Sequence, residues 1–527
     1  MKFLFSFLLL SASIIAYSQH DPSKTEDKFR RALQYIRLSY VDTVNENELT
    51  EIAIRKMLEE LDPHSIYMSS EEIKQANEPL EGNFEGVGIQ FQIIRDTINV
   101  VDVISGGPSE AVGIRAGDKI VAIDNENATG KIVNNNYVLK KLRGAKGTVV
   151  VLGIARQGTP EIIEFSVTRD KIPIYSIDAA YMVTPEIGYI KINRFAAKTM
   201  SEFSDAIKEL RQENFKSLIL DLRDNSGGYL QTSVELADQF LPKNQLIVYT
   251  EGRTDKRSDY FATSKGAFEK GKLVVLINEG SASASEIVSG ALQDCDRALI
   301  IGRRSYGKGL VQRPFSFTDG SVMRMTVARY YTPSGRCIQK PYKDGNEKYF
   351  KDLGERMKHG EFVHPDSIKF PDSLRYRTTA GRIVYGGGGI MPDIFIALDT
   401  NKYSDYYVKL IRKNYFSTFS LDYTNENRPA LLSKYKTMEK FKKDFKISKD
   451  LIKSFIDGAT AANIEFDQSG FDQSKEIIET IIRAFLARNL YGQEAYYYII
   501  GEIDEELNKA INCIEQPGLF EKYSIRY

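Results

Sequence analysis

Tryptophan is absent from this chain of 527 residues, and histidine and cysteine are scarce, with four and three residues. The cysteines, Cys295, Cys337 and Cys513, lie far apart without a CxxC pair, so neither a disulfide scaffold nor a zinc cluster fits their spacing. At most one disulfide can form. Because histidine is also rare, we expect neither histidine-based catalysis nor a bound metal or cofactor.

An excess of charge of either sign is missing too. The chain carries 71 Lys+Arg and 71 Asp+Glu, and no basic stripe is visible, which argues against nucleic acid as a partner. Hydrophobic residues make up 42% and charged residues 27%, values that are ordinary for a globular protein. Single cores stop growing near ~250–300 residues, so the length predicts roughly two to four domains.

Long apolar runs are confined to the first residues. Residues 3–16 are almost wholly apolar and follow Met1-Lys2, and small residues stand at 16–18. The run is shorter than the ~20 residues that span a bilayer. It predicts a signal peptide over 1–18 and an exported protein, periplasmic or associated with the cell envelope, with no transmembrane segment in the mature chain. An uncleaved membrane anchor is the alternative.

Apolar residues at three-to-four spacing predict a helical arm over 19–81. Its second helix ends at Leu61-Asp62-Pro63-His64-Ser65, because the residue before a proline is pushed out of the helical region. His64 has two interpretations. It is either a catalytic residue or, more simply, a histidine that hydrogen-bonds beside a turn.

Residues 82–170 change to short alternating runs between glycine-rich turns, which predicts a small β-rich domain. Two segments, Gly86-Val87-Gly88-Ile89 and residues 107–120, together resemble a PDZ domain. In such domains backbone N–H groups of the glycine loop bind the carboxylate of a peptide's C-terminus. The resemblance therefore implies that Gly86, Val87, Gly88 and Ile89 bind the C-terminus of a protein or peptide substrate. A PDZ fold that serves only as a spacer is the alternative.

Residues 171–400 follow an α/β pattern. Two buried strands, 217–222 and 272–278, each lead through a small-residue turn into a helix. Such turns favour chemistry, because helix N-termini present unpaired N–H groups and the positive end of a dipole.

The second of these turns ends in three closely spaced serines. Ser283 stands among small residues that leave room for a substrate, but Ser283 and Glu286 also match a helix capping box. Lys308, between two glycines, is placed to reach inward, and Gln312 lies four residues on, on the same face. A neutral Lys308 amine can take a serine proton. Lowering a lysine pKa from ~10.4 to ~7–8 costs ~3–4 kcal/mol, so an ordinary solvated lysine is the alternative.

Five motifs in one order resemble the C-terminal processing, or tail-specific, serine peptidases: residues 221–228 (DLRDNSGG), 281–286 (SASASE), 306–312 (YGKGLVQ), 331–336 (YTPSGR) and 386–393 (GGGGIMPD). The resemblance extends from about 61 to 396. It implies a multidomain α/β fold with a PDZ domain and a crotonase/ClpP-like protease core.

The same resemblance assigns roles within the site. It implies that Ser283 is the nucleophile, that Lys308 is the general base, and that Gln312 orients Lys308. It also implies an oxyanion hole built from the N–H of Ala284 and that of Gly227 or Gly228. The family has proline where this chain has Ser226, which leaves open which glycine amide faces the oxyanion.

Two further segments carry no catalytic motif. Residues 341–380 are polar and predict a surface insertion, and residues 401–527 predict a helical region that forms a homo-oligomer or binds an adaptor. We expect an exported serine endopeptidase. The alternative is an inactive PDZ scaffold on a decayed protease core, whereas an α/β-hydrolase is excluded because no G-x-S-x-G motif is followed by a histidine.

Overall fold

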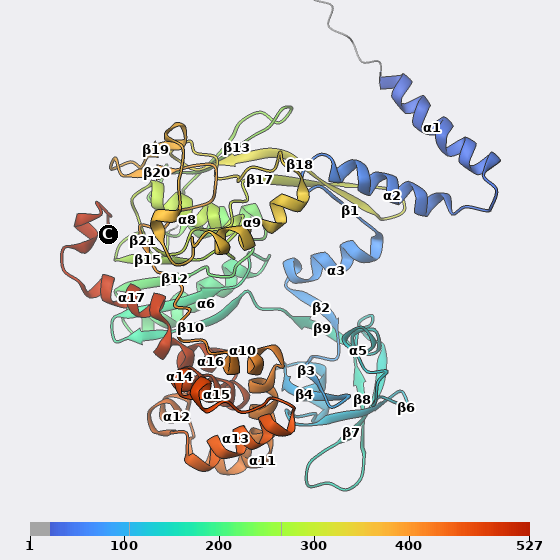
Figure 1. Ribbon diagram of the computed structural model, residues 1–527, viewed down its shortest axis with the longest axis vertical. Helices are drawn as coiled ribbons and strands as arrows, with labels where there is room; N and C mark the ends of the chain where they lie inside the picture. The colour runs from blue at the N-terminus through green and yellow to red at the C-terminus, as the bar shows by residue number, and fades with distance from the viewer. Residues whose placement is uncertain (1–21, 105, 265) are drawn as a thin grey trace, which may run out of the picture. The chain divides into compact units, whose positions relative to one another are not determined.

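The computed structural model describes residues 22–104, 106–264 and 266–527 (Figure 1). The predicted signal peptide therefore lies outside the described residues. The chain divides into two compact units, Met1–Leu61 and Asp62–Tyr527. The first contains α1 (Pro22–Ser39) and α2 (Glu46–Glu59), as the apolar spacing predicts. No helix in the described part of the chain is both long enough and apolar enough to cross a bilayer.

The second unit begins with a short strand that periodicity did not predict. β1 (Ile66–Met68) pairs with β18 (Val322–Tyr331) in an antiparallel sheet that also contains β13 (Leu246–Glu251), β14 (Ser258–Phe261) and β17 (Leu310–Ser316). A strand of three residues is too short to show an alternating pattern. The segment after Asp62 therefore belongs to the sheet that contains β18. Only α3 (Ser70–Glu81) continues the predicted helical arm.

A small β-rich domain follows, as predicted. Its sheet has the order β3-β4-β5-β7-β8, with β3 at an edge. The strands are β2 (Asn83–Gly86), β3 (Ile89–Ile94), β4 (Thr97–Val103), β5 (Lys119–Ile123), β6 (Glu126–Asn127), β7 (Val149–Ala155), β8 (Ile163–Thr168) and β9 (Asp170–Pro173). Two short helices, α4 (Pro108–Val112) and α5 (Asn135–Leu142), complete the domain. Its core is aliphatic and includes Val100, Ile120 and Leu152.

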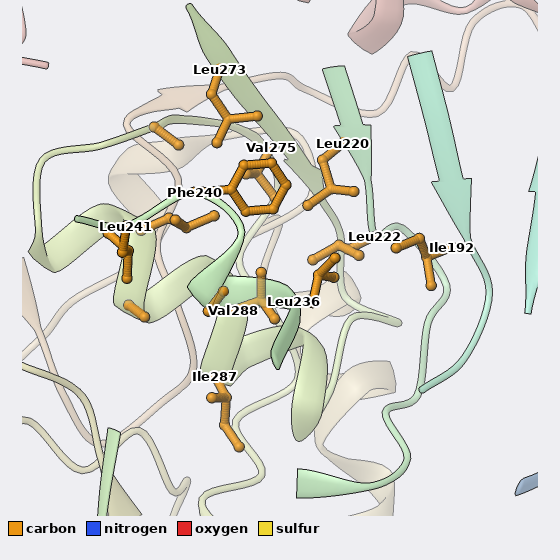
Figure 2. Packing of buried hydrophobic residues seen from close by; sticks show 14 of the residues in the cluster. Ile192, Leu220, Leu222, Leu236, Phe240, Leu241, Leu273, Val275, Ile287 and Val288 are labelled. Atoms are coloured by element: carbon orange, nitrogen blue, oxygen red, sulfur yellow. The ribbon is translucent and has the colours of Figure 1, made fainter. Parts of the chain in front are cut away.

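The α/β core contains a six-stranded sheet of order β10-β11-β12-β15-β16-β21, parallel from β11 onward. Its strands are β10 (Ile177–Thr184), β11 (Ile187–Ile192), β12 (Ser217–Asp221), β15 (Leu273–Ile277), β16 (Leu299–Gly302) and β21 (Ile394–Phe395). On one face, Leu220 and Val275 pack against α6 (Thr199–Gln212), α7 (Leu230–Asp238) and α8 (Ala284–Asp294) (Figure 2). Burying such a side chain contributes about 1.5–3 kcal/mol.

The opposite face of this sheet is covered by the end of the described chain. Ile219 and Leu276 point to this face and pack with residues of α17 (Glu505–Glu515) and α18 (Leu519–Lys522). In Figure 1, α17 runs along this sheet in red. Because successive strand residues point to opposite faces, the continuous apolar strands need a layer on each side.

Residues 341–380 are mostly exposed, as the prediction of a surface segment requires. They form α9 (Asn346–Lys358), the 3-10 turns η1 (Pro365–Ser367) and η2 (Asp372–Leu374), and β19 (Arg375–Arg377), which pairs with β20 (Ile383–Tyr385). Tyr349 and Arg356 of α9 are buried. Arg356 donates to the backbone carbonyls of Arg304 and Ser305 at 2.8 and 3.1 Å. The helix thus lies at the surface, and these two buried side chains attach it to the rest of the α/β core.

The predicted helical region, 401–527, has two parts. Helices α10 to α16 share their own aromatic core, which includes Phe416, Phe441 and Phe455. They are α10 (Asp405–Arg412), α11 (Tyr415–Lys434), α12 (Met438–Asp444), α13 (Lys449–Ala461), α14 (Gln468–Gln473), α15 (Lys475–Tyr491) and α16 (Gln493–Ile500). We call residues 405–500 the helical domain. The turn η3 (Gly501–Ile503) connects it to α17 and α18, which belong to the α/β core.

The helical domain contacts both other parts of the second unit. Tyr497 of α16 donates its hydroxyl to Asp178 of β10 at 3.0 Å. On the other side, Gln92 of β3 donates to Ser417 of α11 at 2.6 Å. The backbone of Gly117 lies so close to α11 that an added Cβ would meet Asn425 Oδ1 at 2.5 Å.

Candidate active site

Three turns meet at the carboxyl ends of neighbouring parallel strands. We call residues 223–228, after β12, the glycine turn; residues 279–283, after β15, the serine turn; and residues 303–308, after β16, the lysine turn. In α/β sheets this edge is where ligands bind. The order of the strands thus brings together residues that the sequence separates.

Ser283 has an unusual backbone. It stands directly before α8 with φ +55° and ψ −111°, a conformation that serine seldom adopts. Every residue of α8 is buried, whereas Ser283 is partly exposed. A fully buried helix thus follows a serine that stands at a strained, partly exposed position.

The capping box that the sequence offers for Ser283 and Glu286 is present at the start of α8. The Glu286 carboxylate accepts a hydrogen bond from Ser283 N–H at 2.8 Å, as in a capping box. The Glu286 N–H bonds to the Ser283 backbone carbonyl at 2.9 Å and also faces the Ser283 side chain in the capping-box arrangement. Ser283 is thus both the N-cap of α8 and a partly exposed serine.

Glu286 joins the serine turn to the lysine turn. Its buried carboxylate also accepts hydrogen bonds from the N–H groups of Gly307 and Lys308, at 2.7 and 2.8 Å, and from the Ser305 hydroxyl at 2.6 Å. Burial raises the pKa of Glu286 to about 7, although all of these donors favour the ionised form. Sequence reasoning saw Glu286 only as a cap.

Tyr330 makes a second connection between Ser283 and Lys308. Its buried hydroxyl lies 2.6 Å from the Lys308 carbonyl oxygen and 3.1 Å from that of Ser283. Burial raises the Tyr330 pKa well above its usual value, so the hydroxyl stays a donor. The backbones of Ser283 and Lys308 are thus connected on both the N–H and the carbonyl side.

The Lys308 amine has no hydrogen-bond or salt-bridge partner in residues 22–104, 106–264 and 266–527, and it is only partly exposed. Burial lowers its pKa, and the positive charge of Arg324 adds to this effect. An ordinary surface lysine would keep its usual pKa. The side chain is thus more readily neutral near pH 7 than an exposed lysine.

Gln312 lies on β17, and its amide nitrogen donates to the Thr326 hydroxyl at 3.4 Å. Thr326 in turn donates to the carboxylate of buried Asp62 at 3.0 Å. The Gln312 amide oxygen is therefore left to accept a hydrogen bond. No contact between Gln312 and Lys308 is found among the described residues. Sequence reasoning missed Thr326, because nothing in its pattern marks it, and took Asp62 only as part of a turn.

His64 hydrogen-bonds beside a turn, as the simpler interpretation predicts. Its Nε2 lies 2.8 Å from the Tyr349 hydroxyl, and its backbone N–H donates to Asp62. Burial and the positive charge of Lys308 lower the His64 pKa to about 4. His64 is therefore neutral at pH 7 and adds no charge beside Lys308.

The glycine turn lies directly against Ser283. A Cβ added to Gly227 would lie 2.8 Å from Ser283 Cβ and 3.1 Å from Ala284 N. The Gly227 N–H is occupied, because it donates to the side-chain oxygen of Asn225 at 2.9 Å. Within the described residues, the N–H groups of Gly228 and Ala284 make no hydrogen bond. Of the two glycines, Gly228 is thus the one with an available donor.

Asn225 holds the glycine turn in place. At the next position the family has proline, and this chain has Ser226. The buried side chain of Asn225 also donates to the Ile192 carbonyl at 2.9 Å, and its own carbonyl accepts from Ala282 N–H and the Ser285 hydroxyl. The asparagine thus connects the glycine turn to the serine turn. These bonds supply rigidity that Ser226 itself does not.

The predicted carboxylate loop lies between β2 and β3. Gly88 has a φ of +77°, which favours glycine, and the carbonyls of Val87 and Gly88 accept bonds from Ser109 and Ile104. No backbone hydrogen bond from the N–H of Val87 or Gly88 is found among the described residues. Both donors are thus available beside the open edge of β3.

Four protein-family models match the chain. Peptidase family S41 matches residues 186–346, and a PDZ domain matches 86–167. The activating protease CtpB N-terminal domain matches 11–72, and a family of unknown function matches 406–492. The PDZ match falls within the predicted domain at 82–170.

Curated relatives give the same assignment. A carboxy-terminal-processing protease of Bartonella bacilliformis is 37% identical over 339 residues, which are 63% of this chain and 77% of that protein. The carboxy-terminal processing protease CtpB of Bacillus subtilis is 34% identical over 63% of this chain and 69% of its own. The fold and these likenesses define a PDZ-containing protease. The chain belongs to peptidase family S41, among the carboxy-terminal processing proteases.

Solved structures are also similar. The photosystem II D1 C-terminal processing protease is 26% identical and covers 71% of this chain and 93% of its own, with a TM-score of 0.36. The PDZ domain of a carboxy-terminal protease from Vibrio cholerae, in complex with peptide, covers 18% of this chain and 99% of its own at 24% identity, with a TM-score of 0.17. The predicted family and the mixed α/β fold are confirmed by the family models and curated relatives.

Proposed function

We propose that the protein is an exported serine endopeptidase that binds substrate C-termini through its PDZ domain and cleaves peptide bonds with a Ser283–Lys308 dyad. One observation carries the proposal: the buried Glu286 carboxylate accepts hydrogen bonds from the N–H groups of both Ser283 and Lys308. A single acceptor thereby holds the nucleophile and the base in one arrangement. Membership of a serine peptidase family supports the same chemistry.

Cleavage begins when Ser283 Oγ attacks the scissile carbonyl carbon and its proton passes to the neutral Lys308 amine. The oxygen that becomes negative accepts hydrogen bonds from Ala284 and Gly228 N–H. The C–N bond then breaks, and Lys308 returns the proton to the leaving amine. Water attacks the acyl ester and gives its proton to Lys308, which restores the Ser283 hydroxyl as the acid product leaves.

Gln312 orients the base in this scheme. Its amide nitrogen is engaged by Thr326, so its amide oxygen is the group that can accept a hydrogen bond from the Lys308 ammonium. A neutral amide does this without adding a charge. An aspartate in its place would raise the lysine pKa and leave less neutral base.

Substrate recognition rests on the PDZ domain. We infer that N–H groups of the loop Gly86–Ile89 bind the substrate carboxylate while the peptide pairs with the edge strand β3. The predicted signal peptide over 1–18 places the mature enzyme in the periplasm or cell envelope. Oligomerisation or adaptor binding through residues 401–527 stays a prediction.

The first prediction tests the dyad. Ser283→Ala and Lys308→Ala should each lower kcat for a peptide substrate by about a thousandfold or more, because each removes a group that acts in the bond-making step. Wild-type kcat should rise with pH through the lowered Lys308 pKa, since only the neutral amine accepts a proton. Lys348→Ala, an exposed lysine of α9, is the control. Cleavage that persists in purified Ser283→Ala would contradict the assignment.

Covalent labelling separates this enzyme from an inactive PDZ scaffold. A fluorophosphonate should label wild-type protein at Ser283, and Lys308→Ala should slow that labelling. A scaffold with a decayed core would bind C-terminal peptides and show no labelling of Ser283, with or without such a peptide.

A further inference from the structure

Two carboxylates at the start of α17 contact the site from a part of the chain that the S41 model does not match. Asp504 is the N-cap of α17, and Glu506 follows in its first turn. We call these two residues the carboxylate pair. They come 158 or more residues after the end of the family match at 346. Their role therefore cannot be read from the family motifs.

The pair makes a close network with two arginines. Asp504 binds Arg223 through both carboxylate oxygens, at 2.9 and 2.7 Å. Glu506 binds Arg223 with one oxygen and Arg303 with the other. Arg303 also binds Glu279 at 2.8 Å. The arginine side chains are 11% and 9% exposed, so water screens these contacts weakly.

The two arginines that the carboxylate pair binds, and Glu279, which Arg303 binds, are the first residues of the three turns. Arg223 begins the glycine turn, Glu279 begins the serine turn and Arg303 begins the lysine turn. Asp504 and Glu506 bind Arg223 and Arg303 directly, and Glu279 through Arg303. One short segment thus connects the starting points of all three turns that carry the proposed nucleophile, base and oxyanion donors.

Attachment of α17 to the core does not require these ion pairs. Leu507, Ala510 and Ile514 of α17 already pack in the apolar layer over the sheet. Packing alone, in turn, does not hold the arginine heads, because Arg223 and Arg303 border a cavity of about 760 Å³. The buried Asp221 carboxylate at the end of β12 also binds Arg223, at 2.6 Å, and Glu279 binds Arg303 at 2.8 Å. Glu506 adds the link between the two arginines, because it binds both of them.

We propose that Asp504 and Glu506 are positioning residues that hold the glycine, serine and lysine turns in register for catalysis. The inference rests on the proposed peptidase function and adds a role for the segment after the helical domain. The pair contacts neither the PDZ loop nor β3 among the described residues, so it should affect turnover and leave substrate binding unchanged.

Neighbouring carboxylates make matched controls. Glu502 and Glu505 belong to the same segment, but they pair with Arg483 and Lys402, which begin none of the turns. The test compares Asp504→Asn and Glu506→Gln with Glu502→Gln and Glu505→Gln. Asparagine caps helices as well as aspartate, so Asp504→Asn preserves the α17 cap that Leu507 N–H completes.

We expect Asp504→Asn and Glu506→Gln to lower kcat by about tenfold to a hundredfold with little change in KM, because small misplacements of reacting groups are costly. The two control variants should keep wild-type kcat. Amide hydrogen exchange should become faster in peptides covering the three turns and stay unchanged in the PDZ domain. If Glu506→Gln fails to fold, Asp504→Asn provides the same comparison.

The outcomes separate this inference from the proposed function. Wild-type kcat in Asp504→Asn and Glu506→Gln, beside an inactive Ser283→Ala, would overturn the positioning role and leave the peptidase standing. Equal losses in the two control variants would also overturn it, since they would reflect general destabilisation. If wild-type protein does not cleave peptides, the proposed function fails. Hydrogen exchange in the three turns then decides the positioning role by itself.

Discussion

Glu286 is surrounded only by hydrogen-bond donors. Three backbone N–H groups and one hydroxyl point at its two oxygens, and an ionised carboxylate, which only accepts, matches all of them. An amide of the same shape would turn its NH2 group toward at least one of these donors. Leaving a buried donor unsatisfied costs about 1–3 kcal/mol.

Glu286→Gln should therefore lower the free energy of unfolding by about 1–3 kcal/mol and lower kcat by about tenfold or more. Urea denaturation and peptide cleavage measure the two effects. Glu72→Gln is the matched control, because Glu72 occupies the same place in the exposed capping box of α3 and should change little. Equal behaviour of the two variants would mean that Glu286 acts only as a cap.

At this scale, sequence reasoning found the residues that a motif marks and missed those that only the fold brings near. Ser283, Lys308 and Gln312 follow one another in known strings. Asp62 lies 264 positions from its partner Thr326, and no local pattern predicts that contact. The structure places Ser283 and Lys308 in adjoining turns and Gln312 on β17, and their chemical roles stay proposals.

The backbone of the glycine turn is compatible with proline at position 226. Ser226 is exposed, its φ is not among the positive values, and its N–H makes no backbone hydrogen bond within the described residues. Proline needs a negative φ and no donor. The neighbouring bonds of Asn225 hold the turn in this chain, so the proline of the family is compatible with the position but not required.

Ser226→Pro should leave kcat close to wild type and raise the free energy of unfolding by about 0.4–1 kcal/mol, because it restricts the unfolded chain. Thermal or urea denaturation measures the gain, with Ser226→Ala as the control for loss of the hydroxyl. A clear loss of stability in the proline variant would show that the backbone at 225–226 does not suit proline.

Strands and helices with strong local signals were predictable from the sequence. β12 was predicted over 217–222 and ends at Asp221, and β15 was predicted over 272–278 and is observed at Leu273–Ile277. Both are apolar runs between turn residues. β1 was missed because a strand of three residues is too short to show a pattern, and only its pairing with β18 defines it.

At the scale of the whole molecule, the PDZ domain contacts the helical domain through polar groups. Gln92, Asn425 and Arg428 each have a buried side-chain atom without a hydrogen-bond partner among the described residues. Partial desolvation raises the pKa of Asp102 on β4, and the charges of Arg428 and Arg488 oppose that shift. Polar, incompletely paired interfaces between domains are the ones that open most readily.

Asp102→Arg should loosen this interface, because it places a third positive charge beside Arg428 and Arg488. Amide hydrogen exchange of β3 and β4 should become at least several times faster, while exchange of the α/β core stays the same. Glu164→Arg, on β8 at the other edge of the same sheet, is the control. Unchanged exchange in Asp102→Arg would show that these charges do not hold the domain.

The contact of Asp504 with Arg223 joins residues 281 positions apart, and this separation has a consequence for timing. A growing chain folds its earlier domains first, so the PDZ domain and most of the α/β core exist before residues 504–506 are made. If the three turns depend on residues 504–506, the chain is inactive until these residues have been made. Activity would then begin only after the last part of the α/β core has joined the three turns.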